Sequence, residues 1–396
     1  MASRIADHGM DYNARACRVL MGAGAIDSVA EEVLRLGGSR VLLVCGRITG
    51  RSALVRSVTA CLGKLLVARF DEVVEHSRVP IVEQVAGLAR SSGADLLLAI
   101  GGGSASDTAK AAAILLAEGG PLEQHANRFT PPDRLVQQDL RQPKLPILAI
   151  PTTASAAEVT PGLGVKSADG HKLLFWDDKV AARTVILDPA ANLEVPAALM
   201  ATSGMNALAH CIEGLYSKRR NPIAEGLALQ GLRLLGDGLR ELMGAPGEID
   251  VRARILYGAH ASGMVIASTR TCIHHGLCHS LGAPGGLPHG VANSVMLPHA
   301  MRFLLPVAAP QLKLAAQALG ADVTGLDDLA AAERAIDEVR RIQLALRVPA
   351  RLRDTDLAHD SLAAIARHVM GDRALFFTPG PPVTQDQLLA VLEAAW

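Results

Sequence analysis

The spacing of apolar residues changes near residue 190, and this change limits the folds that the chain can adopt. Before it, short apolar runs alternate with helical segments, most clearly at 41–45, 94–100, 145–150 and 183–187. Strands that alternate with helices favour a parallel sheet covered by helices on both faces. From Pro196 onward, apolar residues recur at helical spacing. We therefore expect an α/β protein with a Rossmann-like nucleotide-binding domain over 1–189 and an all-helical domain over 190–396.

The pattern also predicts the individual elements of both parts. Further strands are expected at 16–21 and 66–70 of the first part. In the second part, periodic apolar residues predict helices at 199–217, 222–243, 249–265, 292–304, 309–319, 327–346, 358–369 and 384–395.

A glycine-rich turn follows the apolar run 94–100. Gly101, Gly102, Gly103 and Ser104 lead from this run into an alanine-rich helix. Without Cβ atoms the backbone can approach a pyrophosphate closely, and the first N–H groups of the helix, aided by the Ser104 hydroxyl, can donate to its oxygens. The turn predicts a dinucleotide site, and the alternative is a plain tight turn between strand and helix.

Candidate ligand-binding residues also follow two other predicted strands. Thr152, Thr153 and Ser155 follow the run 145–150, at the sheet edge where α/β proteins place ligands. Gly46 and Arg47 follow the run 41–45, at a strand end where nicotinamide folds often carry a carboxylate for the adenosine ribose. A glycine leaves room for the 2′-phosphate of NADPH, and a guanidinium can pair with it. Alternatively, Gly46 serves only the turn and Arg47 points into solvent.

Five of the chain's 13 histidines lie between Thr271 and His299. His275 and His279 are four residues apart and would share one face of a helix, and a Pro-Gly-Gly-Leu-Pro run would bring His289 back as the next segment begins. Asn206 and His210 show the same spacing in another apolar helix. Two helices that each offer such a pair can build a metal or catalytic site, whereas a lone histidine is more often satisfied within a core.

Composition excludes several classes of partner. The chain has 39 basic and 39 acidic residues, which suggests neither nucleic acid nor an anionic membrane as a partner. No apolar run approaches the roughly 18 residues of a membrane span, and residues 1–8 lack the apolar core of a signal peptide. The six cysteines include no C-x-x-C pair and are interpreted as reduced thiols. We expect a cytoplasmic enzyme that acts on a small molecule.

At these motifs the chain resembles the iron-containing alcohol dehydrogenase family, whose fold also includes glycerol dehydrogenase and dehydroquinate synthase. The resemblance covers nearly the whole chain. It implies that the turn from Gly101 to Lys110, with Asp107, binds the cofactor phosphates, and that the Thr152 loop lies on the nicotinamide side. Lys172, beyond this loop, is a further candidate contact to the cofactor. It also implies that a metal, if one were held, would bind Asn206, His210, His275 and His289. His279 matches a histidine near the nicotinamide, and the family's habit implies a homodimer.

One departure from the family pattern concerns the metal. Members that depend on a metal carry aspartate where this chain has Asn206. An amide oxygen is neutral and a poorer ligand for iron or zinc than a carboxylate. The maleylacetate reductase branch, which works without a tightly held metal, is similar here and at His274, His275 and His279, whereas Asp107 and the residues after His289 are closer to the alcohol dehydrogenases.

The sequence thus predicts an oxidoreductase that uses NADH or NADPH to reduce a small oxo acid, without a tightly held metal. His279 is the predicted general acid, because imidazole titrates near neutral pH. His275, His289, His210 and Asn206 would contact the substrate. Three alternatives stay open: a metal-dependent alcohol dehydrogenase, a lyase similar to dehydroquinate synthase, and a catalytically inactive nucleotide-binding protein.

Overall fold

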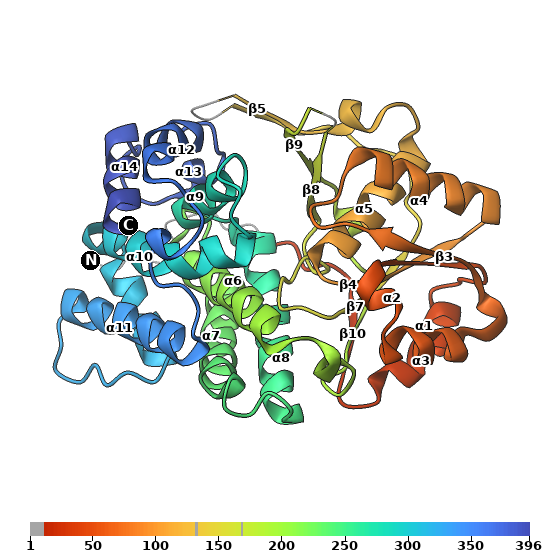
Figure 1. Cartoon of the computed structure of the whole chain (residues 1–396), viewed down its shortest axis with the longest axis horizontal. Coiled ribbons are helices and arrows are strands. Elements are labelled where there is room, and N and C mark those ends of the chain that lie inside the picture. Colours follow the sequence, from red (N-terminus) through yellow and green to blue (C-terminus); the bar gives the residue numbers. More distant parts are fainter. Residues whose placement is uncertain (1–11, 131–133, 168) are drawn as a thin grey trace.

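The computed structural model describes residues 12–130, 134–167 and 169–396. The expected fold class is confirmed: a parallel sheet with helices forms one part, and helices alone form the other (Figure 1). The predicted absence of a signal peptide concerns residues 1–8, which lie outside the described residues. No helix in the described parts of the chain is long and apolar enough to cross a membrane.

Six parallel strands form the sheet. Their order is β1-β10-β7-β4-β2-β3, and their bounds are β1 Arg18–Met21, β10 Thr184–Leu187, β7 Ile147–Pro151, β4 Leu96–Gly101, β2 Val41–Gly46 and β3 Leu66–Val73. Both faces are covered, which is why the central strands are continuous apolar runs. Alternate residues of β2 point to opposite cores: Leu43 packs with α1 (Val29–Arg35) and α3 (Ala53–Leu62), and Leu42 packs with α4 (Val79–Ser92) and α5 (Gly103–Glu118).

The strand order reverses between β2 and β4. From β2 the chain moves outward to β3, then returns to β4 and continues to β7 on the other side. The carboxyl ends of strands at such a reversal form a crevice that binds ligands in open α/β sheets. Gly46 ends β2 and Gly101 ends β4, so both predicted cofactor turns lie at this crevice.

Two hairpins were not predicted from the sequence. One pairs β5 (Arg128–Thr130) with β6 (Arg134–Val136), and the other pairs β8 (Gly162–Lys166) with β9 (Lys172–Trp176). The second hairpin packs on α5 and lies between the two parts of the molecule (Figure 1). Lys172, expected only in the segment after the Thr152 loop, is the first residue of β9 and stands directly opposite Lys166.

The helical part has one large apolar core. Its main helices are α6 Ala197–Tyr216, α7 Pro222–Leu242, α8 Ile249–Thr269, α9 Ile273–Gly282, α10 His289–Ala318, α11 Asp328–Leu346, α12 Leu362–Val369, α13 Ala374–Phe377 and α14 Gln385–Ala394. The prediction of separate helices at 292–304 and 309–319 is wrong, because α10 continues through Pro306 and Pro310. Core burial of Leu304, Ala308 and Leu312 along this stretch outweighs the backbone hydrogen bonds lost at the prolines.

The last strand of the sheet ends at Leu187 and α6 begins at Ala197. These bounds bracket the predicted domain division near residue 190. That the two parts are separate domains stays a prediction.

Candidate active site

A cavity of about 380 Å³ lies between the sheet edge, the β8–β9 hairpin and helices α6, α9 and α10. Residues from every predicted group except the Gly46 turn line it: Gly103, Ser104, Asp107, Ser155, Lys172, Asn206, His210, His275, His279 and His289. The structure therefore brings the glycine-rich turn and the histidine cluster to opposite sides of one cleft.

The other predicted residues of the two turns, Gly101, Gly102, Thr152 and Thr153, do not line the cavity but support the residues that do. Gly101 has φ +145°, a conformation that L side chains rarely adopt. A Cβ on Gly102 would lie 3.1 Å from Oγ1 of Thr153, and the Thr152 N–H donates to the Gly101 carbonyl at 2.9 Å. Thr152 and Thr153 thus hold the turn rather than line the cavity. The turn and the N-terminus of the long helix α5 fit a nucleotide pyrophosphate.

The predicted contacts to the adenosine ribose lie farther out, at the end of β2. Arg47 is exposed and forms an ion pair with the exposed Glu72 at 3.6 Å. A Cβ on Gly46 would lie 3.1 Å from the carbonyl oxygen of Val73, so any side chain there is tightly placed. Neither residue lines the cavity around the histidines.

Charged residues of α5 fix the cleft wall. Oδ2 of Asp107 accepts the Gly164 N–H at 3.1 Å and so ties the hairpin to α5. The buried Lys110 ammonium donates to the carbonyls of Ala157, of Thr160 at 2.7 Å and of Gly162 at 3.1 Å. Oγ of Ser104 accepts the His76 N–H at 3.1 Å, and no acceptor among the described residues takes its own O–H, which can donate to a ligand oxygen.

Four imidazoles meet at the floor of the cleft. The rings of His210 and His275 stack with centroids 4.8 Å apart, and those of His279 and His289 stack at 5.9 Å. His275 lies 6.0 Å from both His279 and His289. Burial and the mutual repulsion of the rings hold the pKa values of His210 and His289 well below the ordinary value. These two histidines are therefore neutral at physiological pH.

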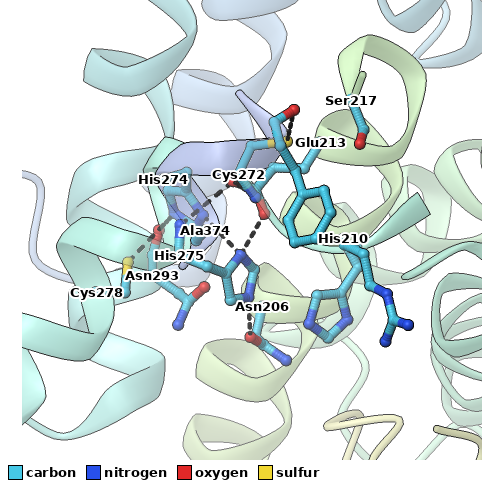
Figure 2. Close-up of polar contacts among 12 residues, drawn as sticks. Asn206, His210, Glu213, Ser217, Cys272, His274, His275, Cys278, Asn293 and Ala374 are labelled. Atoms are coloured by element: carbon cyan, nitrogen blue, oxygen red, sulfur yellow. Dashed lines mark hydrogen bonds and ion pairs between the residues drawn. The ribbon is translucent and has the colours of Figure 1, made fainter. Parts of the chain in front are cut away.

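His275 is held between a carboxyl group and an amide (Figure 2). Its Nδ1 lies 2.5 Å from Oε2 of Glu213, and its Nε2 lies 3.2 Å from Oδ1 of Asn206. Burial raises the pKa of Glu213 to about 7, and burial lowers that of His275 far below its usual range. With Oδ1 of Asn206 as the acceptor, Nε2 of His275 carries the hydrogen, and Nδ1 then accepts from the protonated form of Glu213. In this tautomer His275 offers no lone pair to a metal.

His279 is oriented by Asp372. Nδ1 of His279 donates to Oδ2 of Asp372 at 2.7 Å. Burial by itself would raise the pKa of Asp372, but the charge and the hydrogen bond of His279 lower it to about 2. The carboxylate is thus ionised at neutral pH. Nε2 of His279 has no hydrogen-bond partner among the described residues, and the ring lines the cleft.

Sequence reasoning missed both carboxyl groups. Glu213 had a signal, because it stands at i+7 from Asn206 and i+3 from His210 on the same face of α6. Asp372 had none, because it lies in the short loop between α12 and α13, 93 residues from its partner.

A parallel sheet with a phosphate-type turn at its reversal point, facing an oriented imidazole across a cleft, defines a nicotinamide-dependent oxidoreductase. The comparisons with known proteins agree. Residues 16–189 match the family model described as iron-containing alcohol dehydrogenase, and residues 200–396 match that of the Fe-containing alcohol dehydrogenase family, C-terminal. The chain belongs to the iron-containing alcohol dehydrogenase family.

Similar proteins of known activity indicate which kind of oxidoreductase the chain is. Maleylacetate reductase 2 of Cupriavidus pinatubonensis is 36% identical over 78% of this chain and 77% of its own length. The crystal structure of maleylacetate reductase from Agrobacterium tumefaciens is 28% identical with a TM-score of 0.82, covering 98% of both chains. A 1,3-propanediol oxidoreductase, also 28% identical, has a TM-score of 0.91 and covers 98% of this chain and 100% of its own. The chain is thus an NAD(P)H-dependent oxidoreductase similar to maleylacetate reductases.

The family name implies iron, but the residues present do not fit that metal. The donors would be His210, His275, His289 and the neutral amide of Asn206, with no anionic ligand among them. Glu213 faces the Nδ1 side of His275, whereas Asn206 faces its Nε2. Within the described ranges, the one group of His, Cys, Asp or Glu with ligand atoms close enough for a metal is Glu213, His274 and His275. Hydrogen bonds already join these three.

Proposed function

We propose that this enzyme reduces the carbonyl group of a small oxo acid to a hydroxyl group without a metal ion. The observation that carries the proposal is the pairing of His275 with Asn206 and of His279 with Asp372 in one cleft. In the first pair, Asn206 engages the His275 nitrogen that would otherwise bind a metal. In the second pair, His279 supplies a proton. The similarity to maleylacetate reductases supports an oxo acid as substrate.

His279 gives its proton to the carbonyl oxygen. Asp372 is ionised and stabilises the imidazolium form, in which Nε2–H faces the cleft. NAD(P)H, when bound, would supply the hydride to the carbonyl carbon. Nε2 of His279 protonates the carbonyl oxygen, and the ring becomes neutral. The same nitrogen accepts the proton in the reverse direction.

Neutral imidazoles polarise the carbonyl in place of a Lewis acid. His210 and His289 line the cleft on either side of His275. An N–H aimed at the oxygen where negative charge develops stabilises the transition state in a site closed to water. Oligomeric state is a further expectation: a homodimer rests on the family resemblance, and light scattering would test it.

A substrate panel tests the proposal. Purified enzyme is assayed with NADH and NADPH against oxo acids, aldehydes and ketones, with and without chelator, and its metal content is measured. We expect turnover of oxo acids that survives chelation. Turnover confined to simple aldehydes and lost with the metal would overturn the proposal.

That second outcome defines the alternative function, a metal-dependent alcohol dehydrogenase. The observation that favours it is the convergence of His210, His275 and His289 on one cleft. A stoichiometric metal in the purified protein would decide for it.

A further inference from the structure

Asn206 presents an amide nitrogen to the catalytic cleft. The residue lies on α6, lines the cavity and is only 6% exposed. Its Oδ1 accepts the hydrogen bond from Nε2 of His275 at 3.2 Å, and Figure 2 shows Nδ2 on the side turned away from that ring. Within the described ranges, no acceptor takes a hydrogen bond from Nδ2. A buried donor without a partner is costly unless a ligand supplies the acceptor.

This nitrogen can be reached by a ligand. The unpartnered side-chain atoms that are sealed inside the described parts of the chain include Oδ1 of Asn293, but Nδ2 of Asn206 is not one of them. The cavity that Asn206 borders has a volume of about 380 Å³ and is also lined by His279 and His289. An amide nitrogen can donate but cannot accept, so its partner must be an acceptor atom such as a carbonyl oxygen.

A series of hydrogen bonds fixes the orientation of this amide. Oε1 of Glu213 accepts the backbone N–H groups of Cys272 at 3.0 Å and of His275 at 3.3 Å, and Oε2 lies 2.5 Å from Nδ1 of His275. The ring of His275 is thereby held between Glu213 and Asn206, which share one face of α6. Because Nε2 occupies the oxygen side of the amide, its N–H groups are left for the cleft. A donor that is held in place before the substrate arrives needs no reorganisation during the reaction.

We infer that Nδ2 of Asn206 donates a hydrogen bond to the carbonyl oxygen of the substrate and stabilises the negative charge that develops there. The inference rests on the proposed metal-free reduction, in which no Lewis acid polarises the carbonyl group. As the hydride bonds to the carbonyl carbon, the π electron pair moves to the oxygen, which takes a proton from Nε2 of His279. Asn206 keeps both of its amide hydrogens. A carbonyl oxygen has two lone pairs and can accept from Asn206 and His279 at the same time.

The amide differs as a donor from the imidazoles of the cleft. A nitrogen of a neutral imidazole carries either a hydrogen or a lone pair, and protonation changes both the charge and the donors of the ring. The amide nitrogen donates whatever the protonation state of its neighbours. Its contribution to the rate should therefore be the same on both sides of neutral pH, which separates it from the contribution of a titrating histidine.

Two variants distinguish a donor to the substrate from a mere support for His275. Asn206→Asp keeps the size of the side chain and an oxygen that accepts from Nε2 of His275, but it replaces the donor with a second carboxylate oxygen. Asn206→Ala removes both groups. With chelator present, at about pH 8 where a carboxyl group is ionised, each should lower kcat by about 10²- to 10³-fold, the usual effect of removing one oxyanion donor. The loss in Asn206→Ala should be the same at about pH 6.

Thr202→Ala is the matched control. Thr202 is a polar residue of the same helix that bonds to the carbonyls of Ala198 and Leu199 and does not line the cavity. Both alanine variants should keep the parent's affinity for NADH and NADPH, measured by fluorescence titration. A substrate analogue with a methylene group in place of the carbonyl should bind the parent and Asn206→Ala equally in calorimetry, because it has no oxygen for the donor.

The outcomes separate this inference from the proposed function. A kcat of Asn206→Asp within about threefold of the parent would show that Asn206 only anchors His275, and would overturn the inference while leaving the reduction of oxo acids intact. If the enzyme reduced simple aldehydes and no oxo acid, but both variants still lost kcat with chelator present, the donor would stand and the proposed substrate class would fail. Weakened nucleotide binding that accounts for the whole loss in Asn206→Ala would also overturn the inference.

Discussion

Nδ1 of His279 lies 2.7 Å from Oδ2 of Asp372, although 93 residues separate them in the chain. The hydrogen bond fixes the ring and leaves Nε2 as the one nitrogen that can exchange a proton in the cleft. Removing the ring in His279→Ala should lower kcat by about 10²- to 10⁴-fold. Nucleotide affinity, measured by fluorescence titration, should be nearly unchanged. Asp372→Asn keeps the ring and should cost less. A kcat within a few-fold of the parent in His279→Ala would mean that the ring only packs against the nicotinamide.

The second prediction concerns metal. Because Asn206 occupies the Nε2 side of His275, activity should survive dialysis against EDTA, and added Fe²⁺ or Zn²⁺ should raise it little. Asn206→Asp supplies an anionic ligand and should tighten metal binding by about tenfold or more. Metal content after purification and competition with a chromophoric chelator measure both effects. Asn206→Ala is the control, since it removes the amide without adding charge.

The third prediction concerns the nucleotide. We expect NADPH to be accepted at least comparably to NADH, because Gly46 carries no carboxylate and Arg47 is adjacent. Gly46→Asp should shift kcat/KM toward NADH by about tenfold or more. A Cβ at Gly46 would crowd the Val73 carbonyl at 3.1 Å, so Gly46→Ala is needed to separate crowding from charge. A parent with a preference of about a hundredfold for NADH would show that Arg47, bound to Glu72, does not reach the ribose.

The fourth prediction concerns the dependence of stability on pH. The pKa of Glu213 is about 7 in the folded protein, above its ordinary value near 4.5, because the group is buried. The folded state therefore retains a proton that the unfolded chain releases, and stability from this group is lost as pH rises through that window. Glu213→Gln imitates the protonated acid. It should remove about 1–3 kcal/mol of the fall in unfolding free energy between about pH 5 and pH 7.5.

Urea unfolding at both pH values measures this change. Glu333→Gln, at an exposed glutamate paired with Arg302, is the matched control and should leave the slope unaltered. Because the amide introduced by Glu213→Gln could still donate to Nδ1 of His275, activity should be retained. A pH slope equal to that of the parent would place the proton elsewhere.

The elements predicted from the sequence are the strands and helices whose buried apolar residues form a regular pattern. The strands near 41–45, 94–100 and 183–187 are apolar because both sheet faces are covered, and most helices of the second part follow from one apolar stripe each. Hairpin β8–β9 escaped prediction because Gly162 and Gly164 weaken strand propensity, and packing on α5 decides its conformation.

The histidines of the site were predicted because they fall close together in the sequence. Their partners were not, because loop residues such as Asp372 meet a helix only after folding.

The ammonium group of Lys110 lies among backbone carbonyl oxygens, in a position where a dissociable cation could otherwise bind. Two carbonyl oxygens of the loop between β7 and β8, and that of Gly162 at the start of β8, converge on its ammonium group, much as backbone oxygens surround potassium. Because this cation is tethered to α5 by its own side chain, dialysis cannot remove it, and the loop keeps its shape whatever monovalent salt surrounds the protein. This part of the cleft wall therefore needs no bound metal cation to gather these carbonyl groups.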